Sequence, residues 1–90
     1  MYRIIDSRGT GKTSRLFLLA KETDSAVACS NPYAMREKAA SYGINGITFI
    51  TYKEAMEGLV PVDKIMIDEL ELFARYAIKY DLTGFTASLD

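Results

Sequence analysis

Two short polar runs in this sequence have the residue types and spacing that phosphate and magnesium chemistry requires. The first run, residues 7–13, follows the largely apolar residues 2–5 and contains two glycines, a lysine and hydroxyl side chains. Where a strand passes into a helix, backbone N–H groups can surround a phosphate, a lysine can neutralise its charge, and a threonine hydroxyl can bind Mg²⁺. We therefore expect Thr13 to ligate magnesium, and we expect the phosphates to be bound by Gly9, Thr10, Gly11, Lys12, Thr13 and Ser14.

The second run, residues 64–69, is an apolar segment that ends in the carboxylates of Asp68 and Glu69. A carboxylate at the end of a buried strand can hold Mg²⁺ through a water molecule or contact Thr13. A neighbouring glutamate can act as the base that polarises an attacking water, which favours hydrolysis. We therefore predict Asp68 as a magnesium ligand, with Glu69 and Lys12 as catalytic residues. The alternative is that the two acids only begin a helix, where acids are favoured by the helix dipole.

Alternating strands and helices are the elements that would bring these two runs together. Alternation of this kind implies parallel strands joined by right-handed crossovers in a three-layer α/β domain, with the ligand site at the carboxyl ends of the strands. A capping box, Thr51 with Glu54, opens a short helix that ends at Gly58. Strands are predicted at residues 2–6, 25–29, 46–51, 64–68 and 85–89, and the longer helices at residues 12–22, 32–42 and 69–79.

The composition is typical of one soluble globular domain over residues 1–90. The chain is 49% hydrophobic and 26% charged, and its net charge is −1 without a cluster of lysines or arginines, so we expect no strong nucleic-acid binding by the protein alone. No segment has the length and apolarity of a membrane span or the pattern of an export signal, so we expect a cytoplasmic protein without membrane contacts.

The absence of histidine and the single cysteine limit the chemistry further. Cys29 lies in an apolar run and has no second cysteine to pair with, so an internal disulfide or a thiolate metal site is excluded. Histidine-based catalysis and histidine metal ligands are excluded as well. The chemistry must therefore use carboxylates, hydroxyls, lysine and arginine.

Residues 9–13 and 65–69 resemble the Walker A and Walker B motifs of P-loop NTPases. The resemblance is to the additional-strand, catalytic-glutamate division, which includes RecA-like ATPases, helicases and phage terminase motors. Arg8 is similar to the arginine of terminase phosphate loops and would then contact phosphate, and residues 86–88 are similar to the helicase strand that senses the γ-phosphate. Asp6 departs from the motif, because it stands where Walker A has its first glycine and brings negative charge toward the phosphate.

The resemblance implies a RecA-like core with a five-stranded parallel sheet in the order 1-5-4-2-3, whose first strand is an open edge. It implies ATP and Mg²⁺ as ligands and a homo-oligomer or protein partner at that edge. It also implies a small phage or prophage ATPase with weak hydrolysis, acting in the host cytoplasm. Activity of the isolated chain should be low, because a second lobe or subunit normally supplies the arginine that stabilises the transition state.

Two alternatives remain open at this stage. One is a P-loop binding or regulatory module that does not hydrolyse nucleotide and contacts a phage or host protein. The other is a small nucleotide kinase, against which stands the lack of an arginine-rich lid segment.

Overall fold

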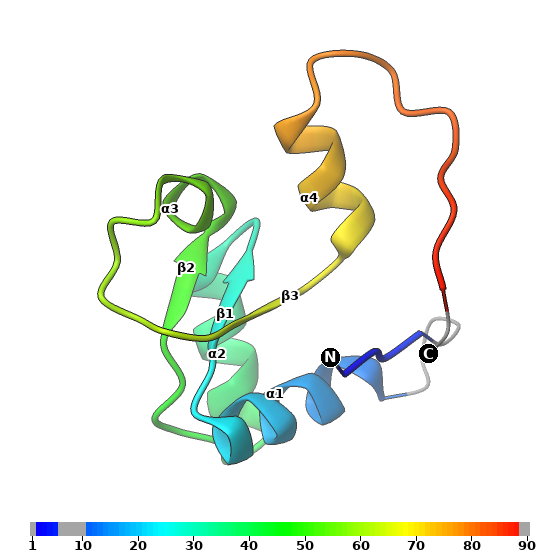
Figure 1. Ribbon diagram of the computed structural model, residues 1–90. Coiled ribbons are helices and arrows are strands. Elements are labelled where there is room, and N and C mark those ends of the chain that lie inside the picture. The colour runs from blue at the N-terminus through cyan, green and yellow to red at the C-terminus, as the bar shows by residue number, and fades with distance from the viewer. Residues whose placement is uncertain (1, 6–10, 89–90) are drawn as a thin grey trace.

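The computed structural model describes residues 2–5 and 11–88, and within them helices and strands alternate along the chain (Figure 1). Four helices and three strands form in these residues. The helices are α1 (Lys12–Thr23), α2 (Pro32–Ser41), α3 (Tyr52–Glu57) and α4 (Leu70–Ala77), and the strands are β1 (Ala26–Cys29), β2 (Phe49–Thr51) and β3 (Ile65–Ile67).

The three strands form a parallel sheet in the order β2-β1-β3. Val27 in the central strand is paired with Phe49 on one side and Met66 on the other. All four residues of β1 are buried, as expected for a strand that is covered on both faces and paired on both edges. The continuous apolar run at residues 26–29 therefore becomes the centre of the sheet.

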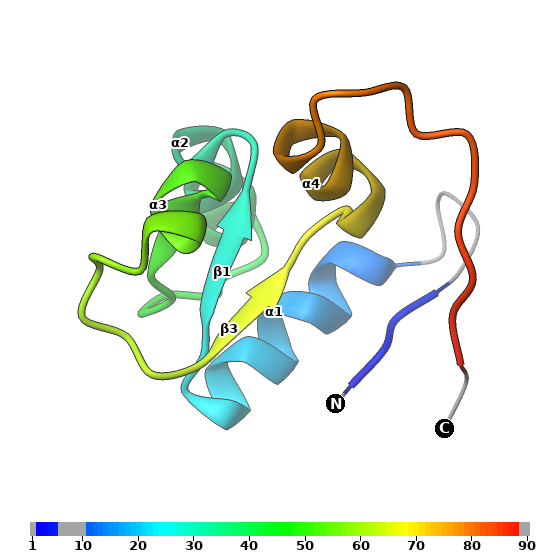
Figure 2. The ribbon, with the colours of Figure 1, turned by 45° about the horizontal axis from the view of Figure 1, so that its top comes forward.

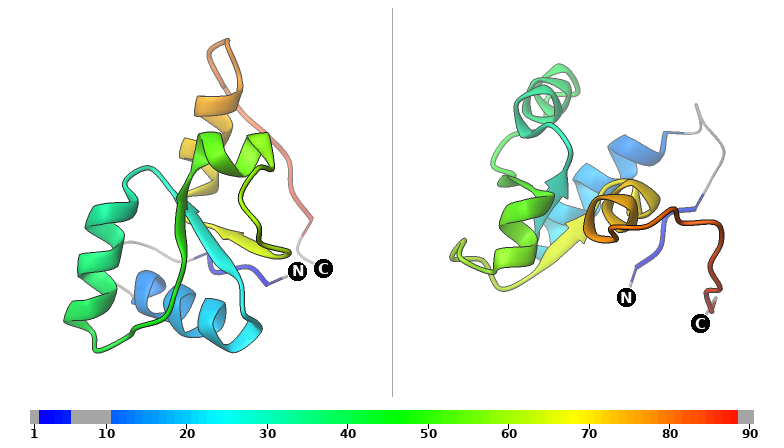
Figure 3. Two further views of the ribbon diagram at one scale, coloured as in Figure 1. Left: turned by 90° about the vertical axis from the view of Figure 1, so that its left-hand side faces the viewer. Right: turned by 90° about the horizontal axis from the view of Figure 1, so that it is seen from above.

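Helices cover both faces of this sheet (Figure 3). On one face, Phe17 of α1 and Ala39 of α2 pack with Val27 and Cys29 of β1. On the other face, Ala28 packs with Ile50 and Tyr52, and Phe73 of α4 packs against them only partly buried. Successive residues of a strand point to opposite faces, so β1 contributes to both clusters.

Helix-capping signals in the sequence are confirmed. The side chain of Asn31 accepts a hydrogen bond from the Ala34 N–H at 3.2 Å, one residue before Pro32 begins α2. Thr51 and Glu54 form the predicted capping box, with bonds of 3.0 Å to the Thr51 hydroxyl and 2.9 Å to the Glu54 carboxylate. These bonds are made within a few residues of the chain, so the helix starts follow from local sequence.

The predicted five-stranded RecA-like sheet in the order 1-5-4-2-3 is wrong. The structure has a three-stranded sheet, too small for such a core, and residues 2–5 and 85–88 belong to no strand. Figure 2 shows both segments beyond β3, on the side away from β1. The alternation of residue types at 85–88 predicts a strand, but a strand also needs a neighbouring strand to pair with and an apolar surface to pack against. Phe85 remains 72% exposed, so this segment buries too little apolar surface to hold a position in the sheet.

Candidate functional site

The first half of the predicted phosphate loop cannot be judged from the structure. Asp6, Arg8, Gly9 and Thr10 lie outside the described residues. Phosphate binding by Arg8, Gly9 and Thr10 therefore stays a prediction, as does the repulsion expected from Asp6.

The end of the loop and the start of α1 lie within the described residues. Gly11 has φ 79°, the left-handed region, and α1 begins at the next residue, Lys12. A side chain at Gly11 would make only ordinary contact, 3.6 Å from the Ser14 hydroxyl, so the backbone conformation is what favours glycine. Ser14 donates its hydroxyl to the Gly11 carbonyl at 3.0 Å. The first backbone N–H groups of a helix have no partner within the helix and are the usual donors to an anion.

Asp68 directly follows β3 and continues its pairing with β1, because its N–H donates to the Ala28 carbonyl at 2.9 Å. Its side chain is half-buried. Burial raises the pKa of the Asp68 carboxyl and the neighbouring charge of Glu69 raises it further, whereas the charges of Lys38 and Lys12 lower it. The Asp68 carboxyl therefore lies where both lysines act on it.

The charge of Lys12, at the start of α1, acts on the Asp68 carboxyl after β3 and lowers its pKa. In Figure 2 the start of α1 and the end of β3 lie toward the same side of the molecule. Among residues 2–5 and 11–88, no hydrogen bond or ion pair joins Asp68 to Lys12 or Thr13. Asp68 therefore makes no direct polar contact with Lys12 or Thr13.

Glu69 turns the chain sharply between β3 and α4. It has φ 59° and ψ 72°, a left-handed conformation that costs a non-glycine residue about 1–2 kcal/mol, and its side chain is exposed. The Tyr52 hydroxyl donates to the Asp68 carbonyl at 2.6 Å and lies 3.5 Å from the Glu69 carbonyl. Tyr52 therefore holds the backbone turn that presents the two carboxylates.

Tyr52 and Lys38 are site residues that the sequence analysis missed. Burial and, to a smaller extent, the charge of Asp68 raise the pKa of the Tyr52 hydroxyl to about 12. Lys38 lies on α2, and its charge has a larger effect on Asp68 than that of Lys12. Nothing in the helical spacing of α2 singles out Lys38 in the sequence. Tyr52 could have been noticed, because it is an aromatic residue directly after the Thr51 cap.

Cys29 ends β1 beside this site and is buried. Burial raises the pKa of its thiol to about 11, and Asp68 adds to that effect. The thiol donates to the Ile50 carbonyl at 3.7 Å. These properties suit an unreactive core residue, because the thiolate is the reactive form of cysteine.

The residues present are chemically suited to a magnesium ion that is shared with a phosphate. Within the described part of the chain, no three His, Cys, Asp or Glu side chains gather into a metal site. Mg²⁺ does not require such a cluster, because it keeps several waters and binds through one or two carboxylates together with phosphate oxygens. Asp68, with a pKa raised by burial, would gain from a nearby cation, and the half-buried Thr13 could add its hydroxyl.

Two further polar features are the predicted γ-phosphate sensor at residues 86–88 and the arginine of α4. Thr86 and Ser88 are exposed, and the strand that a γ-phosphate sensor requires does not form there. Arg75 pairs with Glu71 on α4 at 3.6 Å, with both side chains about 60% exposed. Arg75 thus makes an exposed ion pair within α4.

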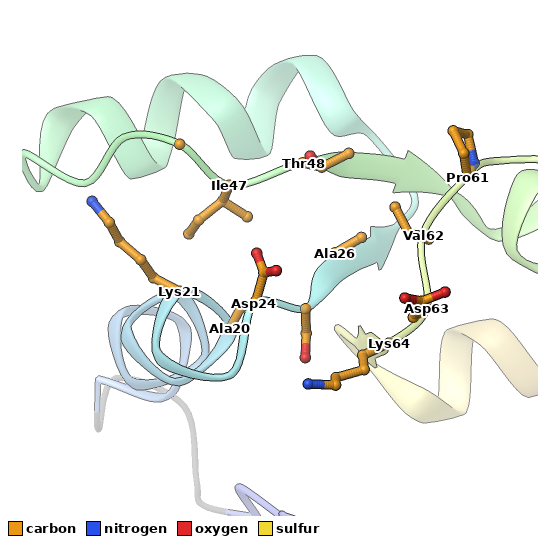
Figure 4. A pocket seen from close by; sticks show the side chains of 12 residues that line it. Ala20, Lys21, Asp24, Ala26, Ile47, Thr48, Pro61, Val62, Asp63 and Lys64 are labelled. Carbon is orange, nitrogen blue, oxygen red and sulfur yellow. The ribbon is translucent and has the colours of Figure 1, made fainter.

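Two hollows lie at opposite ends of the sheet. One has a volume of about 520 Å³ and lies at the amino ends of the strands, where Lys21, Asp24, Asp63 and Lys64 surround it (Figure 4). The other has a volume of about 560 Å³ and lies at the carboxyl ends of β1 and β2, against α4. The second lies at the end of the sheet that carries Asp68.

Comparison of the chain with protein-family models, curated proteins and solved structures gave no match. The resemblance to P-loop NTPases therefore stays an expectation from the motif residues. No helix among residues 2–5 and 11–88 has the length and apolarity to span a membrane.

Proposed function

We propose that this protein binds a nucleoside triphosphate together with Mg²⁺ and hydrolyses it weakly. The observation that supports the proposal best is that the glycine turn at the start of α1 and the end of β3 lie toward the same side of the molecule (Figure 2). A strand-to-helix glycine turn with its lysine and a strand-end carboxylate are the two halves of a phosphate and magnesium site. The proposal concerns this site and does not depend on a five-stranded core.

Each residue has one role in the proposed site. Lys12 and the N–H groups at the start of α1 bind the phosphates, because both present positive charge to an anion. Thr13 and Asp68 ligate Mg²⁺, which when bound offsets the negative charge of the phosphates. Glu69 orients the attacking water and accepts its proton.

Weak activity follows from the surroundings of Glu69. Its side chain is exposed, so bulk water screens its charge and competes for its hydrogen bonds. Arg75, on the helix that follows, pairs with Glu71. The arginine that stabilises the transition state in such sites is normally supplied by a second subunit, so the isolated chain should hydrolyse slowly.

Calorimetric titration with ATP and Mg²⁺ tests the binding. We expect wild type to bind and Lys12→Ala to lose binding, whereas Lys21→Ala, at the far end of the same helix, should bind as wild type does. Phosphate release should fall to background in Glu69→Gln while its ATP binding persists. If wild type does not bind at millimolar ATP, or if Lys12→Ala binds equally well, the proposal fails.

A module that contacts another protein without hydrolysis is the second candidate. The observation in its favour is that α4 has no buried residue, and its Leu70 is 64% exposed. In the described residues, β3 pairs only with β1, so its outer edge can accept another strand. Light scattering at high concentration tests self-association through this surface, and phosphate release that is unchanged by Glu69→Gln would favour this candidate over hydrolysis.

A further inference from the structure

The cleft at the carboxyl ends of β1 and β2 has properties that the proposed phosphate site does not use. Its volume of about 560 Å³ lies within the range of small-molecule sites, roughly 300–1,000 Å³. Carboxyl ends of parallel strands are the usual place for ligands in α/β domains. The cleft therefore has the size and position of a binding site.

The cleft offers a supported aromatic surface. The ring of Tyr52 is nearly fully buried and makes an edge-to-face contact with Phe73 at 5.4 Å between ring centroids. Tyr76 packs beside Tyr52, with centroids 6.1 Å apart, and is still 46% exposed. A ring that is held on one side and open on the other can stack on a planar base.

The charge of the lining selects for an anion. Lys53 and Arg75 are its two charged residues, and no acid is among the side chains that line it. The hollow at the opposite end has two lysines and two aspartates, so its charges balance. The ion pair of Arg75 with Glu71 is exposed and therefore weak, so the guanidinium can turn to a phosphate, which arginine binds in a bidentate way.

From these contacts we infer that the cleft binds a nucleoside monophosphate, with the base stacked on Tyr76 and the phosphate held by Arg75 and Lys53. A mononucleotide fits better than a polymer for two reasons. The cleft offers one exposed aromatic ring, and the sequence, with net charge −1, has no cluster of lysines and arginines to bind a nucleic-acid backbone. Tyr52 links the two sites, since its ring lines the cleft and its hydroxyl donates to the Asp68 carbonyl. The inference depends on the proposed function in one respect only: the monophosphate is a second ligand beside the nucleoside triphosphate.

Calorimetric titration with AMP, GMP, CMP and UMP, each alone, tests this site. We expect wild type to bind at least one of them, and Tyr76→Leu and Arg75→Gln each to weaken binding about tenfold or more, the size of one stacking or charged contact. Tyr80→Leu and Lys79→Gln, exposed residues outside the cleft, are the matched controls and should bind as wild type does.

The Lys12→Ala variant separates the two sites. It should lose ATP but keep the monophosphate, so failure of ATP binding in wild type would refute the proposed function without affecting this inference. Four results would overturn the inference: no binding at millimolar monophosphate, loss of binding in Lys12→Ala, inorganic phosphate competing as well as the nucleotide, or a single-stranded oligonucleotide binding more tightly than its monomer.

Discussion

The part of the domain up to Tyr52 and the part after it differ sharply in packing. All buried hydrophobic residues of the described chain lie between Leu16 and Tyr52. The second part contributes β3 and α4, and α4 buries none of its residues although one of its faces is strongly apolar. Stability should therefore reside in the first part, while the second part should open at low free-energy cost.

The proposed site lies on the boundary between these two parts. Lys12 and Thr13 belong to the helix that packs on the core through Phe17. Asp68 is attached to β1 by its backbone, whereas Glu69 begins the loosely packed α4. In the proposed site, Lys12, Thr13 and Asp68 are thus attached to the well-packed part, and Glu69 to the loosely packed part.

The largest expected effect is the loss of core packing in Phe17→Ala. Phe17 is fully buried and contacts Phe49 and Tyr42, so its truncation should cost about 3–5 kcal/mol of unfolding free energy. Phe85→Ala, the same substitution at an exposed residue of the second part, should cost less than about 0.5 kcal/mol. Urea denaturation measures both, and equal costs would show that the two parts do not differ in packing.

Tyr52→Phe should have an intermediate effect, because it removes the bond to the Asp68 carbonyl and keeps the ring. We expect a loss of about 1–2 kcal/mol, since the carbonyl is left without its donor. Amide hydrogen exchange at the Asp68 N–H should become faster. Tyr80→Phe, at an exposed tyrosine, is the control. If hydrogen exchange at the Asp68 N–H is unchanged in Tyr52→Phe, the tyrosine hydroxyl does not stabilise the backbone at Asp68.

Glu69→Gly should relieve backbone strain and raise the unfolding free energy by up to about 1 kcal/mol. Asp24 has nearly the same conformation, φ 56°, at the end of α1, so Asp24→Gly is a matched substitution in the well-packed part. Thermal denaturation should show similar gains for both variants, but phosphate release should fall only in Glu69→Gly. A loss of stability in Glu69→Gly would mean that the glutamate side chain makes a stabilising contact.

The smallest expected effect is the pH dependence that Asp68 introduces. Its pKa is higher in the folded protein than in the unfolded chain, so the folded state holds the proton more strongly and stability falls as pH rises above the ordinary value of 3.8. Asp68→Asn should therefore be more stable than wild type at neutral pH, and the difference should vanish below pH 3.8. Melting temperatures across this range measure it. Asp81→Asn, at an exposed site after α4, is the control, and its melting temperatures should match those of wild type. If the difference in melting temperature between Asp68→Asn and wild type does not change with pH, the Asp68 carboxyl is not the source of the pH dependence.

Local features of the fold could be predicted because they depend on neighbours in the chain. The caps at Asn31 and Thr51 satisfy N–H groups three residues away, and the left-handed Gly58 ends α3. The apolar run at residues 26–29 predicted a buried strand in the same way. Lys12 and Asp68 were singled out by their places at the start of a predicted helix and at the end of a predicted strand, and α1 and β3 form there, whereas the strand predicted at residues 2–6 does not form in residues 2–5.

The number of strands and the surroundings of Asp68 were decided by tertiary structure alone. Residues 85–88 alternate as a strand would, yet strand pairing requires a second segment at the right distance and enough buried surface to offset lost chain entropy. Lys38 and Tyr52 act on Asp68 because α2 and α3 pack where they do. Sequence by itself thus determined where the capped helices start and that residues 26–29 form a buried strand, since capping bonds and apolar runs depend on residues close together in the chain. Which elements meet depended on packing between distant segments.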